Sequence, residues 1–318
     1  MKKIGLIGGL SWQSTVEYYR VINEESNRRL GGGLDTAECI LYSVNLAQKL
    51  GRMARGEQKQ LGEEFLDIGK KLVAAGADMI LLCTNTMHAV YDVLSSGLSV
   101  PVIHIADATA DAIKKQGLQK VALLGTPFTM SQPFYKDRLK HLHGIDVIVP
   151  TEEQGQEIYR VINEELTFHI LKEKSRRYFL DVIDSLRDQG AQGAILGCTE
   201  IPLLIQQEHT DLPVFDTTVL HAMAAVDAAL AQGIPGAAPS DKKAKKTVLR
   251  PSFLARANIA MGGKKYSKGR CFSCNSFLSV LMIMTAAAAT GAAAWAAASF
   301  DAFSNRKHSH NNSDCQNA

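Results

Sequence analysis

Two short stretches combine a thiol or hydroxyl with small polar neighbours. The first is LLCTNTMH at residues 81–88, and the second is GAILGCTE at residues 193–200. In both, an apolar run typical of a buried strand ends in polar side chains, where the carboxyl end of a parallel strand can meet a ligand. Successive side chains on a strand point to opposite faces, so only one of the neighbours Cys83 and Thr84 can face such a ligand.

The elements that must position these side chains follow an alternating order along the chain, in which each short apolar run is followed by a helical pattern. The runs are KKIGLIGG, ECILYSV, DMILLC and PVIHI, followed by KVALLGT, DVIVP, GAILGC and PVFD. Helical patterns cover residues 14–30, 57–75 and 106–115, begin again near 131, extend over 152–189, begin once more at 200, and end near 230. This alternation predicts an α/β fold in which each half of the body forms a parallel sheet with helices on both faces.

The two halves also match each other in register. KIGLIG at residues 3–8 aligns with KVALLG at 120–125, an offset of 117 residues. The Gly-Ala pairs at 76 and 190 align at an offset of 114, and the Pro-Val pairs at 101 and 213 align at 112. We therefore expect two pseudo-symmetric lobes, residues 1–117 and 118–236, that face each other across a cleft. In this register Thr84 corresponds to Cys198, and Cys83 corresponds to Gly197.

Cys198 has the setting of a reactive thiol. It ends a strand just before a helix, where backbone N–H groups favour the thiolate form. A thiol with an ordinary pKa near ~8.5 needs only a modest depression to supply a base or nucleophile at neutral pH. Two such groups on opposite sides of a substrate carbon would remove a proton from one face and return one to the other. The alternative is that Cys198 is a small buried hydrophobic residue, as most unpaired cysteines are.

Five stretches carry a family resemblance. GLIGGLSWQST, LLCTNTMH, PVIHIADAT, GAILGCTEIPLL and PVFDT together resemble the aspartate/glutamate racemase family, in particular its broad-specificity or L-specific amino-acid racemases. The resemblance covers about residues 1–232. It implies a cofactor-independent amino-acid racemase or epimerase that uses no pyridoxal phosphate, works between two similar lobes and is commonly a homodimer.

One departure from the family pattern makes the two lobes unequal. In two-cysteine members the first catalytic cysteine directly precedes Asn-Thr-x-His, and here Thr84 stands directly before Asn85. The resemblance therefore assigns the retained base to Cys198, acting on an L-amino acid, with Thr84 or a water it holds on the opposite side. A bulge that turns Cys83 inward is the remaining alternative.

The resemblance also assigns substrate contacts. Asn85, Thr86 and Thr199 match positions that bind the α-carboxylate and the ammonium group. The turn ending in Leu10 and Ser11 offers backbone donors, as other glycine-rich strand-to-helix turns do.

Two charged positions are candidates for substrate binding, and each can equally be explained by an ordinary structural role. Glu200 would orient the Cys198 thiol or the substrate ammonium, or it is simply a carboxylate at a helix N-terminus. Arg52, or Lys49 near it, would bind a side-chain carboxylate, although most Lys and Arg on a surface are merely solvated. Thr167 stands where some family members place a lysine, so a strict preference for acidic side chains is not expected.

Composition limits the other function classes. Residues 237–318 hold 12 of the 35 Lys and Arg but only 3 of the 32 Asp and Glu, so the body is acidic and nucleic-acid binding is not expected. Six cysteines in 318 residues form no dense disulfide pattern, which favours a reducing, cytoplasmic location. The body shows no paired metal-ligand spacing, and we expect no metal.

The last part of the chain, 237–318, has a different composition. A basic stretch to residue 270 precedes thirty uncharged residues, and 277–300 is long enough to span a bilayer as one helix. Membrane attachment through this segment is one interpretation. Alanine is only weakly apolar, so a soluble or non-native extension is the other.

Two further functions are compatible with the sequence. A single base suffices for a decarboxylase or isomerase of a small diacid, since protonation then occurs from one face. Loss of one of the two bases is also compatible with a catalytically weak amino-acid binding protein.

Overall fold

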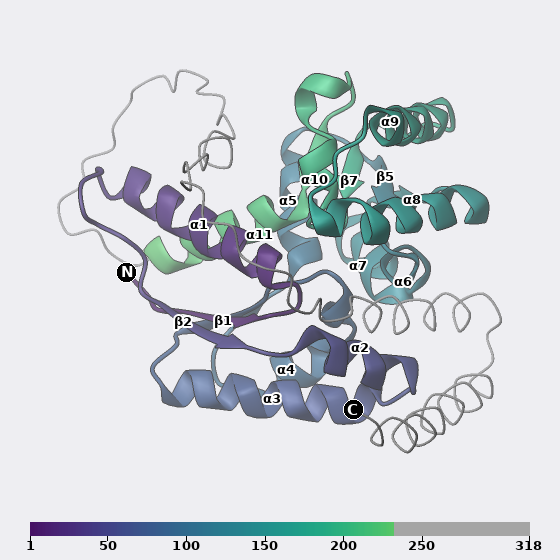
Figure 1. Cartoon of the computed structure of the whole chain (residues 1–318). Helices are drawn as coiled ribbons and strands as arrows, with labels where there is room; N and C mark the ends of the chain where they lie inside the picture. Colours follow the sequence, from purple (N-terminus) through teal and green to yellow (C-terminus); the bar gives the residue numbers. More distant parts are fainter. Residues whose placement is uncertain (232–318) are drawn as a thin grey trace, which may run out of the picture.

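The computed structural model describes residues 1–231, which form two four-stranded parallel sheets (Figure 1). The first has the strand order β2-β1-β3-β4 and the second the order β6-β5-β7-β8. The strands of the first sheet are β1 (Ile4–Gly8), β2 (Cys39–Ser43), β3 (Met79–Leu82) and β4 (Val102–Ile103). Those of the second are β5 (Lys120–Leu124), β6 (Asp146–Ile148), β7 (Ala194–Leu196) and β8 (Val214–Asp216). Equal strand order confirms the predicted α/β fold of two similar lobes, and we call each sheet with the helices that cover it a lobe.

Strand pairing reproduces the sequence offsets residue by residue. Ile7 pairs with Leu82 in the first sheet, and Leu124 pairs with Leu196 in the second. These four positions are related by the offsets of 117 and 114. The β3–β4 pair Ile80 and Val102 corresponds in the same way to Ala194 and Val214, which adds the offset of 112. The alignment of the two halves in the sequence is therefore the same as the alignment of the two sheets in the structure.

Helices cover both faces of each sheet. They are α1 (Trp12–Arg29), α2 (Leu46–Ala54), α3 (Gln58–Ala74), α4 (Tyr91–Gly97), α5 (Ile105–Lys115), α6 (Pro127–Ser131), α7 (Pro133–His143), α8 (Glu152–Glu164), α9 (Glu173–Asp188), α10 (Ile201–Leu204) and α11 (Thr217–Leu230), with short 3-10 helices η1 (Thr86–Val90), η2 (Leu166–Phe168) and η3 (Gln207–His209). Residues of α3 and η1 pack on one face of the first sheet and residues of α1 and α11 on the other. On the second sheet, α8, α9 and α10 cover one face, and α5, α6 and α7 the other.

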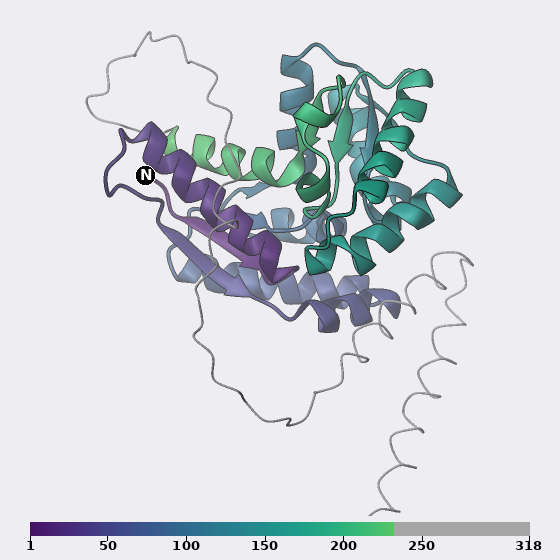
Figure 2. The same cartoon turned by 45° about the horizontal axis from the view of Figure 1, so that its top comes forward.

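One helix crosses between the lobes in each direction. The chain enters α5 from β4 of the first sheet, yet Ile105 and Ile113 pack in the core of the second. It enters α11 from β8 of the second sheet, yet Ala222 and Val226 pack in the core of the first. In both cartoon views α11, in green, lies alongside the purple α1 (Figures 1 and 2). Each lobe therefore depends on a helix that follows the other lobe's last strand.

Two buried tyrosines hold these crossing helices in equivalent ways. Tyr18 on α1 bonds to His221 Nδ1 on α11 with an oxygen–nitrogen distance of 2.8 Å. Tyr135 on α7 donates to Thr109 Oγ1 on α5 at 3.3 Å. The two tyrosines are related by the offset of 117 and their partners by 112, so the duplication extends to side-chain contacts.

The helical region expected over 152–189 is two helices, and that part of the sequence prediction is wrong. The chain leaves α8 through η2 and His169, which has a left-handed φ of 58°, before α9 begins. The lobe boundary near residue 117 stays a prediction, as the crossing helices divide the packing differently from the chain order. No described helix is long and apolar enough to cross a membrane. The segment 277–300 and the rest of the region 237–318 lie outside the described residues.

Candidate active site

Cys198 lies two residues beyond β7 and remains partly exposed. Its thiol contacts the edge of the apolar cluster formed with α8 and α9 and donates to Glu200 Oε2, with a sulfur–oxygen distance of 3.0 Å. Cys83, by contrast, is fully buried with Leu81 and Tyr18 in the core between the first sheet and α1 and α11. The two thiols thus occupy different environments, one at a polar edge and one in an apolar core.

The carboxylate of Glu200 joins groups from both lobes. Ser11 Oγ, at the start of α1, donates to Glu200 Oε1 at 3.2 Å, and Thr199 Oγ1 donates to Oε2 at 2.7 Å. Ser14 Oγ lies 2.5 Å from Thr199 Oγ1 and adds a second link between the lobes. Ser11 has a φ of 108°, a region that L-residues rarely adopt. Cys198, Thr199, Glu200 and Ser11 therefore form one polar network at the lobe interface.

Glycine is required in the turn that brings Ser11 to this network. Gly9 has a φ of 78°, and a Cβ atom there would lie 2.2 Å from the carbonyl oxygen of Val44. Its N–H donates to Thr15 Oγ1 at 2.9 Å. The turn after β1 is consequently tight and bonded to the first turn of α1, which places Ser11 facing the second lobe.

The structure reverses the expected direction of the Cys198 pKa. Burial is the largest cause, and the neighbouring Glu200 carboxylate adds to it, so the thiol pKa lies well above its ordinary value. The backbone N–H groups of Thr199 and Glu200 lower the pKa, but their effect is smaller. The helix that follows, α10, has only four residues, so its dipole is small. The Cys198 thiol is thus hydrogen-bonded to the carboxyl group of Glu200, and its raised pKa favours the protonated form.

Thr84 and Asn85 form the loop after β3, and Thr86 begins η1. Thr84 is 8% exposed, and its carbonyl accepts a hydrogen bond from His88 Nδ1 at 2.8 Å. His88 Nε2 in turn accepts from the Ile105 N–H at 3.2 Å. These bonds hold the backbone of Thr84, whereas its hydroxyl has no hydrogen-bond partner within residues 1–231.

A chain of hydrogen bonds runs from this loop to the strand before Cys198. Asn85 Nδ2 donates to Thr217 Oγ1 at 3.0 Å, and Thr217 Oγ1 donates to the Leu196 carbonyl at 3.0 Å. Asn85 Oδ1 is buried and has no partner among the described residues. An unpaired buried acceptor is costly, so Asn85 can gain from a ligand that offers it a donor.

Equivalent backbone bonds relate the two strand ends. The Cys83 N–H donates to the Ile7 carbonyl at 3.0 Å, and the Gly197 N–H donates to the Leu124 carbonyl at 2.7 Å. Thr84 and Cys198 each follow directly. Asn85 then corresponds to Thr199 and Thr86 to Glu200, so the structural register pairs each expected site residue on one loop with one on the other.

The other expected binding residues divide into two groups. The N–H groups of Leu10 and Ser11 have no hydrogen-bond acceptor in the described part of the chain, and they adjoin the polar network at Glu200. Arg52, on α2, bonds to Glu57 at 3.0 Å and to Glu64 at 2.7 Å, and Lys49 also pairs with Glu64. These cations already have carboxylate partners, and no hydrogen bond joins them to Glu200.

Ser14 and Thr217 were not singled out from the sequence. Both lie in the quoted stretches GLIGGLSWQST and PVFDT, but their roles depend on contacts between residues far apart in the sequence: Ser14 with Thr199, and Thr217 with Asn85 and Leu196. Asp216, just before Thr217, caps α11 by accepting from the Thr218 and Val219 N–H groups. Burial raises the Asp216 pKa to about 6 despite these bonds. His104, two residues after Val102, caps α5 by accepting from the Ala106 N–H at 3.0 Å.

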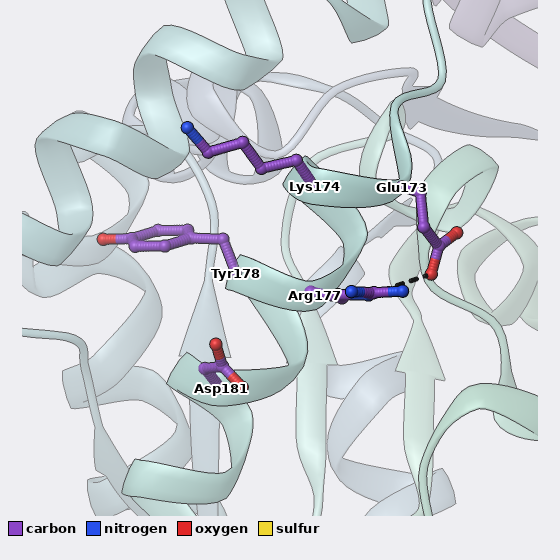
Figure 3. A pocket seen from close by; sticks show the side chains of 5 residues that line it. All are labelled: Glu173, Lys174, Arg177, Tyr178 and Asp181. Atoms are coloured by element: carbon purple, nitrogen blue, oxygen red, sulfur yellow. Dashed lines mark ion pairs between the residues drawn. The ribbon is translucent and has the colours of Figure 1, made fainter.

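A separate surface pocket lies on α9. Figure 3 shows its lining side chains, Glu173, Lys174, Arg177, Tyr178 and Asp181, with Arg177 paired to Glu173 at 3.7 Å. The lining side chains all project from one helix, and none belongs to the network around Cys198. The chemistry expected from the sequence is therefore not at this pocket.

Comparison with known proteins identifies the class of molecule. Residues 7–225 match the Asp/Glu/hydantoin racemase family. The chain belongs to this family, and it is accordingly an enzyme of the racemase class of isomerases.

Individual relatives agree. A candidate Asp/Glu racemase from Yersinia pestis has 47% sequence identity and a TM-score of 0.70, covering 72% of this chain and 100% of that one. An aspartate racemase homologue from Pyrococcus horikoshii OT3 has 36% identity and a TM-score of 0.66, covering 72% and 99%. The broad specificity amino-acid racemase RacX of Bacillus subtilis is 24% identical over 233 residues, which is 72% of this chain and 98% of RacX.

Proposed function

We propose that the protein is a cofactor-independent racemase or epimerase of amino acids of the aspartate/glutamate type. Cys198 removes the α-proton of an L-amino acid, and Thr84, or a water it holds, lies on the opposite side. The observation that carries this proposal is the paired backbone bonds at Cys83 and Gly197, because they make Thr84 the counterpart of Cys198. Family membership supports an amino-acid substrate.

The reaction needs two proton transfers at one carbon. The Cys198 thiolate takes the α-proton, which leaves a carbanion and a neutral thiol. A proton then arrives on the opposite face from the Thr84 side, and water replaces it there. A hydroxyl is a far weaker acid than a thiol, so the enzyme should act faster on L- than on D-substrates.

Substrate binding follows from groups around this pair. The N–H groups of Leu10 and Ser11, which have no acceptor within residues 1–231, are suited to the α-carboxylate, since backbone donors at a strand-to-helix turn bind anions. Asn85 Oδ1, which has no partner among the same residues, can accept from the ammonium group. Thr86, Thr199 and Glu200 complete the contacts. Arg52 could bind a side-chain carboxylate only by exchanging one of its glutamate partners.

The test is hydrogen–deuterium exchange at the α-carbon in D2O, measured for each L- and D-amino acid with the full chain. We expect exchange from L-amino acids, its loss in Cys198→Ser, and its retention in Cys83→Ala, which removes the buried thiol instead. Exchange that survives in Cys198→Ser and disappears in Cys83→Ala would overturn the assignment.

Two further measurements on the same protein, of diacid turnover and of amino-acid binding, separate the other functions. Consumption of a small diacid with release of carbon dioxide would instead indicate a decarboxylase, which one base can serve. Binding of amino acids with neither exchange nor turnover would indicate a binding protein. A homodimer and membrane attachment through 277–300 remain predictions, to be tested by sedimentation of the full chain with and without lipid vesicles.

A further inference from the structure

His88 is a buried side chain that the proposed reaction does not use, yet it contacts the loop that carries Thr84. The residue is 2% exposed, and each of its ring nitrogens has a partner. Nδ1 lies 2.8 Å from the Thr84 carbonyl oxygen, and Nε2 lies 3.2 Å from the backbone nitrogen of Ile105. Such a histidine is either a packed core residue or a support for the backbone that it holds.

The two partners fix which ring nitrogen of His88 carries the proton. A carbonyl oxygen can only accept, so Nδ1 must donate to Thr84, and a backbone N–H can only donate, so Nε2 must accept from Ile105. Burial lowers the pKa of His88 to about 3, so the ring is neutral at pH 7 and has a single N–H. A flip of the ring would break both bonds, and the ring is therefore held in one orientation.

The backbone of Thr84 is bonded on both of its sides. Its N–H donates to the Leu82 carbonyl at 2.8 Å, which closes a three-residue turn, and its carbonyl accepts from His88. Rotation of the peptide group after Thr84 would leave this buried carbonyl without its donor. Because the same peptide group carries the N–H of Asn85, the orientation of both the Thr84 and the Asn85 side chains depends on it.

The second bond of His88 leads to the other lobe. Ile105 is the first residue of α5, one of the two crossing helices, and its side chain packs in the core of the second lobe. His88 thus joins the backbone of Thr84 to a helix of the lobe that contains Cys198. The position of Thr84 is in this way referred to the lobe on the opposite side of the substrate.

The second lobe holds its own reacting residue differently. The register places Pro202 opposite His88, and a proline side chain has no hydrogen-bond donor. The Cys198 carbonyl accepts from the backbone N–H of Ile201 at 3.2 Å. The side-chain support given by His88 is therefore not repeated at this equivalent place, and its loss should affect one side of the reaction more than the other.

We propose that His88 is a positioning residue for the Thr84 side of the reaction, acting through the Nδ1–H bond to the Thr84 carbonyl. The inference rests on the proposed function. In this role His88 fixes the backbone from which the Thr84 hydroxyl, or a water it holds, returns a proton to the α-carbon. A small displacement of a reacting group costs a large factor in rate. Loss of the bond should therefore slow protonation on the Thr84 face and leave proton removal by Cys198 largely intact.

Two amide substitutions separate the two bonds of His88. An asparagine amide nitrogen can take the place of Nδ1 and donate to Thr84, whereas a glutamine amide oxygen can take the place of Nε2 and accept from Ile105. The readout uses the L-amino acid that the wild type exchanges fastest in D2O, and it is the early ratio of deuterated D- to deuterated L-product. We expect this ratio to fall about tenfold in His88→Gln and to stay within about twofold of wild type in His88→Asn.

A ratio of products does not depend on how much of the protein is folded, because misfolding removes both products equally. His104→Asn is the matched control, since His104 is also buried, has its ring centroid 4.6 Å from that of His88 and caps α5 through the Ala106 N–H. It should leave the ratio unchanged. An unchanged ratio in His88→Gln, or an equal fall in both His88 variants, would overturn the inference, the latter by making packing the cause.

A measurement on the wild-type chain tests the bond without any substitution. Nitrogen-15 NMR of the full chain with labelled histidine at pH 7 should show His88 neutral, protonated on Nδ1 and unprotonated on Nε2. The opposite tautomer would overturn the inference even if neither His88 variant folds.

Failure of the proposed function gives a different pattern. Wild-type protein that deuterates no amino acid, with His88 protonated on Nδ1, would refute the racemase proposal and support the bond to Thr84. Wild-type protein that forms both deuterated products, with the same product ratio in His88→Gln, would refute the role of His88 alone.

Discussion

The loops that follow β3 and β7 have equivalent backbone hydrogen bonds but carry different side chains. In the first lobe the chain continues with Thr84 and Asn85, and the Thr84 carbonyl is fastened by His88. In the second it continues with Cys198 and Glu200, which are bonded to each other. Thr84 and Cys198, the reacting groups of the proposed mechanism, therefore occupy equivalent positions and differ in acidity. A symmetric fold can in this way hold an asymmetric site.

The largest expected effect comes from making the two ends alike. Thr84→Cys should raise the rate of α-proton exchange from D-amino acids by about 100-fold or more, because a thiol supplies the missing acid–base group. Exchange from L-amino acids should change much less. The measurement is the ratio of D to L exchange rates in D2O.

Thr84→Ser is the matched control for that substitution, since it keeps a hydroxyl and should leave the ratio near that of wild type. A Cys variant that folds normally and shows no gain on the D side would mean that residue 84 does not face the substrate carbon.

Acidification should destabilise the fold, because three buried histidines, His88, His104 and His221, lie close together. The ring centroid of His88 lies 4.6 Å from that of His104 and 5.5 Å from that of His221. Burial lowers the pKa of His88 to about 3 and of His221 to about 4, and it also lowers that of His104. Below the ordinary histidine pKa of ~6.5 the unfolded chain binds protons that the folded chain refuses, so stability falls as the pH drops from there toward 4.

Asp216 opposes part of this effect. Its raised pKa of about 6 means that the folded chain takes up one proton in the same range. The net loss near pH 5 should be on the order of 2 to 3 kcal/mol per pH unit, to be measured by urea unfolding between pH 7.5 and 4.5. His221→Gln should reduce the slope, and a slope that is flat over this range would contradict the neutral-histidine interpretation.

The smallest expected difference concerns the two equivalent tyrosines. Tyr18→Phe leaves the buried His221 Nδ1 without a donor and should destabilise the fold by about 1 to 3 kcal/mol. Tyr135→Phe should cost less, roughly 1 kcal/mol or below, because its bond is longer and the Thr109 hydroxyl also donates to the Ile105 carbonyl. Urea unfolding at pH 7.5 compares them. Equal losses would show that the two crossing helices are held with the same strength.

The sequence predicted the fold through periodicity and the register through three short matches. Both depend on local patterns, and KIGLIG with KVALLG already contains the offset of 117 that the strand pairing repeats. The break after Glu164 was missed because the pattern on either side is equally helical. The crossing of α5 and α11 was missed because nothing local distinguishes a helix that covers its own sheet from one that covers the other.

The direction of the Cys198 pKa was predicted wrongly from the sequence. The direction of the Cys198 pKa depends on how much water reaches the sulfur and on where the Glu200 carboxylate turns, and neither is a property of spacing. Arg52 illustrates the same limit. Its ion-pair partners are Glu57, at the N-cap of α3, and Glu64, on α3, and the spacing of Arg52 in the sequence does not predict these pairs.

The path of α11 has a consequence for biosynthesis. The apolar side of the first sheet, including Ile4, Leu6 and Leu81, is completed by Ala222, Ala225 and Val226 near the end of the body. When only the amino-terminal half has been synthesised, one apolar face of the first sheet is therefore still exposed. Such a face binds chaperones or other nascent chains. Cutting the gene between the halves should accordingly yield two fragments that are insoluble apart and recover only when co-expressed.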